Sequence, residues 1–179
     1  KDYNWMMEFT EKILEKVAMD LHGTTKVPLG EHVIDYKAPY RRISMTDAIN
    51  EYTGIDITDM TEDDLRRECD RMEIGHSPSM GKGKLIDQIF GEKCEHHFIQ
   101  PTFIIDYPQE TSPLTKKHRS KQGMTERFEL MVNGKELANA YSELNDPIDQ
   151  LERFQEQLRL SEKGDDEAMF IDMDFVRAL

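Results

Sequence analysis

The N-terminal part of the chain carries hydrophobic residues at a helical spacing. In the segment WMMEFTEKILEKVAMDL, residues 5–21, one set of apolar side chains recurs at every fourth position: Phe9, Ile13, Val17 and Leu21. Residues at this spacing form an apolar stripe along an α-helix. We therefore predict a helix that Asn4 caps and that ends near Gly23. Trp5 and the two methionines after it are expected in the core.

Further helix signals lie in the middle of the chain. Thr46 is a candidate cap for a short helix over residues 47–54. Thr61 and Asp64 match a capping box ahead of EDDLRRECDRM. Another helix is predicted from Gly83 to His97. Its partly buried residues are expected to be Leu85, Ile89 and Cys94.

The C-terminal part also has clear helix starts. Asp146 can cap a helix that has Pro147 at its first position. The apolar residues expected on the buried side of that helix are Ile148, Leu151, Phe154 and Leu158. Asp172 is a candidate cap for a short final helix, which follows the acidic run Asp165, Asp166 and Glu167.

Strand patterns separate these helices, and the strongest one is a hairpin over residues 126–143. Residues 26–36 predict two short strands joined around Leu29-Gly30, and residues 103–106 predict a strand between two prolines. In the hairpin, Phe128, Leu130 and Val132 alternate with Glu129 and Met131, which is the period of a half-buried strand. Asn133-Gly134 then predicts a type I′ turn.

The hairpin carries an unusual number of polar side chains. If Asn133 and Gly134 form the turn, Met131 lies opposite Glu136, and Ala138 opposite Glu129. Glu129 and Glu136 are then diagonal neighbours on one face, roughly 7–8 Å apart. Two carboxylates at that separation can share a hard cation and the phosphate chain that it binds. The alternative is a pair of carboxylates facing solvent.

The returning strand poses a problem of orientation. In an unbroken strand, Glu136 and the set Asn139, Tyr141 and Glu143 point to opposite faces. If all of them serve one pocket, an extra residue must shift the register. We therefore predict a β-bulge near residues 137–139, a device common beside active sites.

Composition limits the function classes. The 179 residues carry 36 Asp and Glu against 23 Lys and Arg, a net charge of -13. An acidic chain of this kind is a poor candidate for gripping nucleic acid by itself. It has no apolar run of membrane-spanning length and no signal peptide. Cys69 and Cys94 are expected to be free thiols, and Cys94 with His96 and His97 is a weak metal candidate.

Three segments of the chain resemble class II lysyl-tRNA synthetases. The hairpin matches the family pattern at Phe128-Glu129, at Glu136, Asn139 and Tyr141, and at the run Glu143-Leu144-Asn145-Asp146. The other two segments are QPTFIIDYPQETSPL, residues 100–114, and GDDEAMFIDMDFVRAL, residues 164–179. They stand in family order, and the resemblance extends over essentially the whole chain.

The resemblance implies an α+β fold that forms part of a class II synthetase catalytic domain, with an antiparallel sheet and a helical insertion. It suggests three segments: residues 1–54 and 98–179 from the catalytic domain, and residues 55–97 as the insertion. By resemblance, the chain begins after the family's second motif and stops before its third. Both of these motifs carry ATP-binding arginines, so we expect the isolated chain to be inactive.

The same resemblance suggests roles for the hairpin residues. Glu129 and Glu136 would meet Mg²⁺ and ATP, while Asn139, Tyr141 and Glu143 would bind lysine. No protein nucleophile is implied, so no catalytic side chain is named. The parent would be a cytoplasmic homodimer that activates lysine and transfers it to tRNA(Lys). The basic run at residues 116–121 is either a solvated loop or a flap near ATP or the tRNA acceptor end.

Two rival functions stay open at this stage. Some relatives of these enzymes attach lysine to a protein and keep a similar pocket. Alternatively, the chain is an acidic module that binds a metal or a partner without any chemistry. An anticodon-binding barrel in the parent would favour tRNA, whereas metal binding that is independent of ATP and lysine would favour the module.

Overall fold

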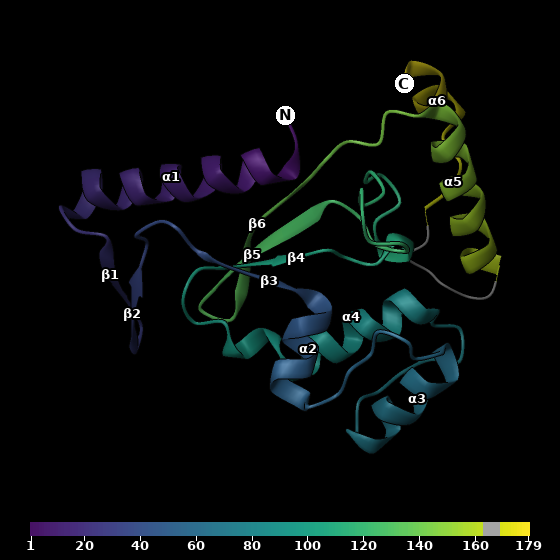
Figure 1. Cartoon of the computed structure of the whole chain (residues 1–179), viewed down its shortest axis with the longest axis horizontal. Helices are drawn as coiled ribbons and strands as arrows, with labels where there is room; N and C mark the ends of the chain where they lie inside the picture. The colour runs from purple at the N-terminus through teal and green to yellow at the C-terminus, as the bar shows by residue number, and fades with distance from the viewer. Residues whose placement is uncertain (163–168) are drawn as a thin grey trace.

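A four-stranded sheet with helices on both faces organises the computed structural model, which describes residues 1–162 and 169–179 (Figure 1). The strands lie in the order β3 (Arg41–Ser44), β4 (Thr102–Ile105), β5 (Arg127–Val132) and β6 (Lys135–Tyr141). Only β3 and β4 run parallel, and the other two pairs are antiparallel. A separate hairpin joins β1 (Lys26–Leu29) to β2 (His32–Asp35). The predicted α+β class, with a largely antiparallel sheet, is confirmed.

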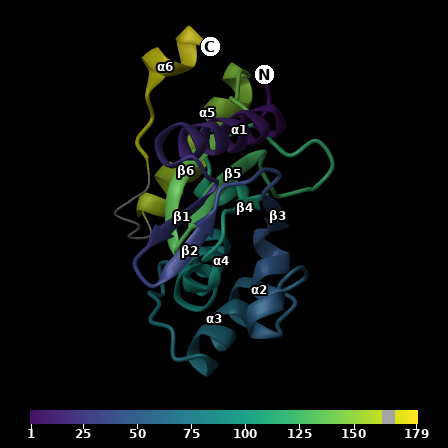
Figure 2. The ribbon, with the colours of Figure 1, turned by 90° about the vertical axis from the view of Figure 1, so that its left-hand side faces the viewer.

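Helix α1 (Tyr3–His22) covers one face of the sheet, as Figure 2 shows. Its cap is Asp2, whose carboxylate accepts the N–H of Trp5, so the predicted Asn4 cap is wrong. The predicted end is confirmed, because Gly23 adopts a φ of 68° in the left-handed region that favours glycine.

The predicted apolar stripe of α1 faces solvent. Phe9 is 44% exposed and Leu21 is 74% exposed, and Ile13 and Val17 are also exposed. The buried residues are Tyr3, Met7, Glu11 and Ala18. Met7 and Glu11 precede Phe9 and Ile13 by two positions, which places them about 200° around the helix from the stripe. Of the expected core residues at the start of α1, Met7 is buried, but Trp5 is 38% exposed.

The opposite face of the sheet packs against α2 (Met45–Thr53) and α4 (Lys82–Lys93), and α3 (Glu62–Arg71) packs on α4 in the same core. The 3₁₀ turn η1 (Glu95–His97) follows α4. The cap of α2 is Ser44 and not Thr46, because the Ser44 hydroxyl accepts the N–H of Asp47. The capping box at Thr61 and Asp64 is confirmed. Helices α3 and α4 fall within the predicted insertion, whose boundaries stay a prediction.

Helix α5 (Pro147–Glu162) buries only part of its predicted apolar stripe and adds polar contacts, since Phe154 is 1% exposed and Leu151 is half-buried. Asp146 caps it as predicted, accepting the N–H groups of Ile148 and Asp149. Ile148 is nevertheless 73% exposed and Leu158 is 42% exposed. Gln150 and Gln157 are buried instead, and they donate to the carbonyls of Pro113 and Glu110. These carbonyls belong to a loop with no helix or strand partner for them, so amide side chains satisfy them.

The remaining elements agree with the sequence. Helix α6 (Met173–Ala178) begins at the predicted Asp172 cap, whereas Asp165, Asp166 and Glu167 lie outside the described residues. Residues 107–125 form a loop, as their Pro, Lys, Ser and Gly content favours, and the 3₁₀ turn η2 (Gln109–Thr111) interrupts it. Cys69 and Cys94 are free and buried. Among the described helices, none is long and apolar enough to cross a lipid bilayer.

The buried face of α1 can be tested with two truncations on opposite sides of the helix. Met7→Ala removes a side chain that is 1% exposed, so the free energy of unfolding should fall by about 2–5 kcal/mol. Phe9→Ala should cost less than about 1 kcal/mol, because that ring is half in solvent. Urea denaturation of the two variants gives both values. Equal losses would contradict the assignment of the faces.

Candidate functional site

A β-bulge in β6 unites the polar residues of the hairpin on one face. Met131 faces Glu136, but Leu130 faces Ala138, which leaves Leu137 as the extra residue. The predicted bulge is therefore confirmed. Because of it, Asn139, and not Ala138, lies opposite Glu129. The bulge reverses the alternation once, so Glu136 and Asn139 come to the same side of the sheet as Glu129.

The turn of the hairpin is held by the end of the helical segment. Asn133 has φ 54° and Gly134 has φ 67°, as the predicted type I′ turn requires. The N–H groups of these residues donate to the carbonyls of Ile99 and Phe98. A Cβ on Gly134 would lie 3.3 Å from the backbone of His96, so the close approach also favours glycine.

Glu129 is a carboxylate of the hairpin with a shifted pKa. Burial raises its pKa, and the nearby charges of Glu136 and Asp87 raise it further. The guanidinium of Arg127 opposes this shift from 2.5 Å. Asn139 donates its amide to the same carboxylate oxygen at 3.4 Å. Glu129 therefore stands between a cation and other acids, which suits a group that exchanges a proton for a metal ion.

Arg127 is a site residue that the sequence analysis missed. Its guanidinium lies 4.5 Å from the centre of the Tyr107 ring and donates to the carbonyl of Thr111 at 3.2 Å. It also donates to the side chains of Ser112 and Asn139. The signal was available, because Arg127 precedes Glu129 by two positions in the same strand and so shares its face.

A cavity of about 390 Å³ lies on this face, and helices α4 and α5 complete its wall. The acids that line it are Asp87, Glu95, Glu110, Glu129 and Glu136. Burial raises the pKa of Glu95, and the charges of Asp87 and Glu136 add to the shift. The contributions of α4 were not predicted, because nothing in a helical pattern shows which strand the helix will face. The cavity is suited to a cation.

The carboxylates of the cavity suit a hard cation that takes only some of its ligands from the protein. Carboxylate oxygens are the ligands that Mg²⁺ prefers, and Mg²⁺ commonly takes one or two of them together with phosphate oxygens and water. Within residues 1–162 and 169–179, no group of three or more His, Cys, Asp or Glu side chains could hold a metal ion. Glu129 and Glu136 can therefore supply part of a Mg²⁺ shell, with a ligand supplying the rest.

The three residues expected to bind lysine follow one another along β6 and beyond its end. Asn139 touches Glu129 and Arg127, so it adjoins the acidic cavity. Burial raises the pKa of Tyr141, and the charge of Glu143 raises it further. Glu143 is exposed, and its backbone pairs with Thr115.

The sequence is similar along its full length to known proteins. The family described as tRNA synthetases class II (D, K and N) matches residues 1–179. A lysine-tRNA ligase from Porphyromonas gingivalis is 70% identical over 179 residues, which are 100% of this chain and 31% of that protein. Lysine-tRNA ligases from Christiangramia forsetii and Azobacteroides pseudotrichonymphae are 68% and 61% identical over the whole chain, which covers 32% and 36% of their lengths.

The match to this family agrees with the α+β architecture. The chain spans about a third of the length of the curated relatives that it matches. Since the family match includes every residue, the chain belongs to the class II tRNA synthetases of the D, K and N group.

Proposed function

We propose that this chain is part of the catalytic domain of a lysine-tRNA ligase. The bulged hairpin carries the proposal, because it presents two carboxylates and a row of hydrogen-bonding groups on one face of the sheet. Relatives that are 61–70% identical over the whole chain bear the name of this enzyme. The complete enzyme would join lysine to ATP as lysyl-adenylate and then transfer the lysine to tRNA(Lys).

Glu129 and Glu136 are the proposed ligands for Mg²⁺ and its bound ATP. Their acidic cavity supports this role, since the carboxylates and their neighbours attract a divalent cation. Mg²⁺ supplies positive charge that offsets the negative charge of the phosphates and of the departing pyrophosphate. Arg127 favours the ionised form of Glu129 by its positive charge and by its hydrogen bond, against the larger effect of burial.

Asn139, Tyr141 and Glu143 are the proposed lysine-binding residues. The lysine substrate has an ammonium at the end of a long apolar stem. Glu143 would pair with the ammonium, and the Tyr141 ring would pack along the methylene groups. Asn139 contacts Glu129, so within the lysine-binding residues it would be the one that orients the substrate carboxylate toward the phosphate. Holding the two reactants in place is the main task of such a site, because no protein nucleophile is needed.

The complete enzyme is proposed to work as a cytoplasmic homodimer. The net charge of -13 on this part argues that most of the tRNA-binding surface belongs to other parts of the enzyme. The names of the relatives favour tRNA over a protein as the acceptor of lysine.

The lysine site is tested by Glu143→Gln in a full-length enzyme that carries these residues. Loss of the charge-assisted hydrogen bond should weaken lysine binding roughly 10- to 100-fold. Calorimetric titration of lysine, with Mg²⁺ and a non-hydrolysable ATP analogue present, measures the effect. Glu31→Gln, in the exposed turn between β1 and β2, is the matched control. An unchanged dissociation constant in Glu143→Gln would remove the proposed ammonium contact.

The metal site predicts a pH dependence. Because burial raises the pKa of Glu129, its carboxylate takes up a proton at a higher pH than an exposed glutamate does. Protons compete with Mg²⁺ for this carboxylate, so Mg²⁺-dependent binding of the ATP analogue should weaken as the pH falls. The midpoint of this loss should lie above about 4.3, the pKa of an unperturbed glutamate. Titrations between about pH 4 and pH 8 measure this midpoint.

Two variants control this experiment. Glu129→Gln cannot lose a proton, so the pH step should disappear and Mg²⁺ should bind more weakly. Glu92→Gln changes an exposed carboxylate on α4 and should leave the step in place. If Glu129→Gln keeps the step, another group is responsible for it.

A further inference from the structure

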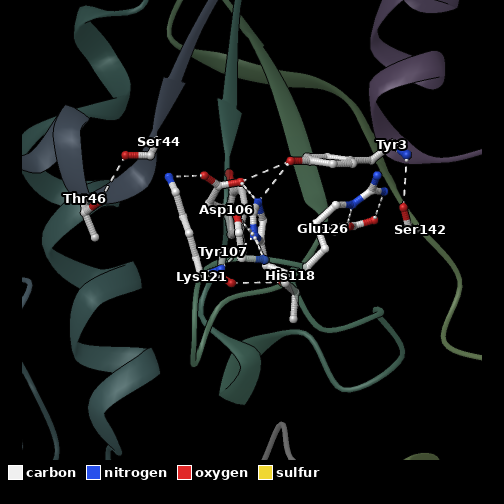
Figure 3. A network of polar contacts seen from close by, with 12 residues as sticks. Tyr3, Ser44, Thr46, Asp106, Tyr107, His118, Lys121, Glu126 and Ser142 are labelled. Carbon is white, nitrogen blue, oxygen red and sulfur yellow. Dashed lines mark hydrogen bonds and ion pairs between the residues drawn. The ribbon is translucent and has the colours of Figure 1, made fainter. Parts of the chain in front are cut away.

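A buried polar network lies at the base of the loop that precedes the hairpin, and Figure 3 shows it. It joins Tyr3 of α1, Asp106 at the end of β4, and His118 and Lys121 of the loop. The His118 ring nitrogen Nε2 lies 3.3 Å from the Tyr3 hydroxyl and 3.5 Å from the Asp106 carboxylate. The Lys121 ammonium lies 2.6 Å from the other oxygen of that carboxylate. The side chains of Asp106 and His118 are only 4% and 9% exposed.

The hydrogen bonds of His118 fix its tautomer. Its Nδ1 accepts the backbone N–H groups of Ser120 at 3.1 Å and Lys121 at 3.0 Å. A nitrogen that accepts carries no proton, so the proton of the neutral ring lies on Nε2. From there it points to Asp106 and Tyr3. His118 therefore stabilises the turn at residues 118–121 through Nδ1. Through Nε2 it connects that turn to Asp106 at the end of β4 and to Tyr3 of α1.

Asp106 is held in a strained conformation that suits this role. Its φ is 63°, a left-handed value that is uncommon for a residue with a side chain. Its N–H donates to the carbonyl of Arg127, so the backbone stays attached to β5 as it leaves the strand. A strained residue persists only where its surroundings determine its position. Here Lys121 and His118 supply that constraint.

The loop reaches from His118 to the proposed lysine site by backbone pairing. Thr115 forms a bridge with Glu143, and the N–H of Lys116 donates to the carbonyl of Ser142 at 2.9 Å. The N–H of Leu144 donates to the carbonyl of Leu114. Glu143 lies beyond the last residue of β6, so the loop supplies this stretch with neighbours in place of a strand.

The start of α1 strengthens the same junction. The N–H of Tyr3 donates to the hydroxyl of Ser142 at 3.1 Å, immediately before Glu143 in the sequence. Arg119 bonds to both Asp2 and Glu126, which ties the loop to the cap of α1 and to the start of the hairpin. Through Tyr3 and the loop, His118 is thus linked to the backbone on both sides of Glu143.

We propose that His118 is a positioning residue for lysine. It fixes the loop, and the loop fixes Glu143 at the distance and orientation that the substrate ammonium needs. The inference rests on the proposed function, in which Glu143 makes that contact. The carboxylates of Glu129 and Glu136 lie within the paired part of the hairpin, whereas Glu143 lies beyond β6 and depends on the loop for its backbone partner. We therefore expect His118 to affect lysine binding more than ATP binding.

The test is His118→Ala in the full-length enzyme, with steady-state rates of lysine-dependent ATP–pyrophosphate exchange. Loss of two hydrogen bonds to the loop should raise KM for lysine roughly 5- to 50-fold, because each neutral bond contributes only modestly. KM for ATP and kcat should change less than about twofold, within the ordinary effect of a remote substitution. His118→Asn places an amide oxygen near the position of Nδ1 and should restore most of the affinity.

The control is His76→Ala, which removes a different histidine–carboxylate pair. His76 lies 3.0 Å from Asp70, and its side chain is 16% exposed. This variant should keep the wild-type KM for lysine. Similar increases in KM for lysine and for ATP in His118→Ala, or no increase at all, would overturn the positioning role. If His118→Ala does not fold, Tyr3→Phe carries the same comparison, because it removes the hydroxyl that lies 3.3 Å from the His118 ring.

A double variant separates this inference from the proposed function. If His118 acts through Glu143, His118→Ala should add little to the KM of Glu143→Gln, because both changes disturb one interaction. Fully additive effects would contradict action through Glu143. If Glu143→Gln alone leaves lysine binding unchanged, the proposed lysine site fails. If Glu143→Gln weakens binding and His118→Ala does not, only the positioning role fails.

Discussion

The alternation of side chains along a strand is the constraint on which this site depends. In a regular strand, Glu136 would point away from Asn139 and Tyr141. One extra residue, Leu137, changes that relation and places all three on the face that carries Glu129. The small residues Ala138 and Ala140 then turn to the other face, where they pack against the core under α1. A single backbone irregularity thus serves the site and the core at once.

The face of the sheet that carries Glu129 and Glu136 holds charged side chains of both signs. Arg127 lies among the acids of the cavity and is held by the Tyr107 ring and by loop oxygen atoms. Burial raises the pKa of Glu129, whereas Arg127 lowers it. Burial and the ion pair therefore act on the charge of Glu129 in opposite directions, and burial has the larger effect.

The long loop before the hairpin has more order than its composition suggests. Its Pro, Lys, Ser and Gly residues predict an irregular segment, and the structure agrees. Polar side chains nevertheless hold it on two sides, with His118 toward α1 and β4 and with Gln150 and Gln157 toward α5. Irregular backbone needs such partners when it is buried, since its carbonyls have no regular ladder to join. Of the two interpretations of the basic run, a freely solvated loop describes His118 poorly, because that side chain is buried.

Local chemistry determined much of this protein from sequence alone. The capping box at Thr61, the type I′ turn at Asn133-Gly134 and the cap at Asp146 were predictable, because each depends on residues close together in the chain. The bulge was also predictable, because Glu136 and Asn139 can share one face of the sheet only if an extra residue lies between them. Tertiary structure decided which sides of α1 and α5 are buried and brought Asp87 and Glu95 of the helical segment to the cavity. The physical reason is that a helix with apolar residues on two sides, or polar residues with distant partners, acquires its buried face only when the surface it packs against is in place.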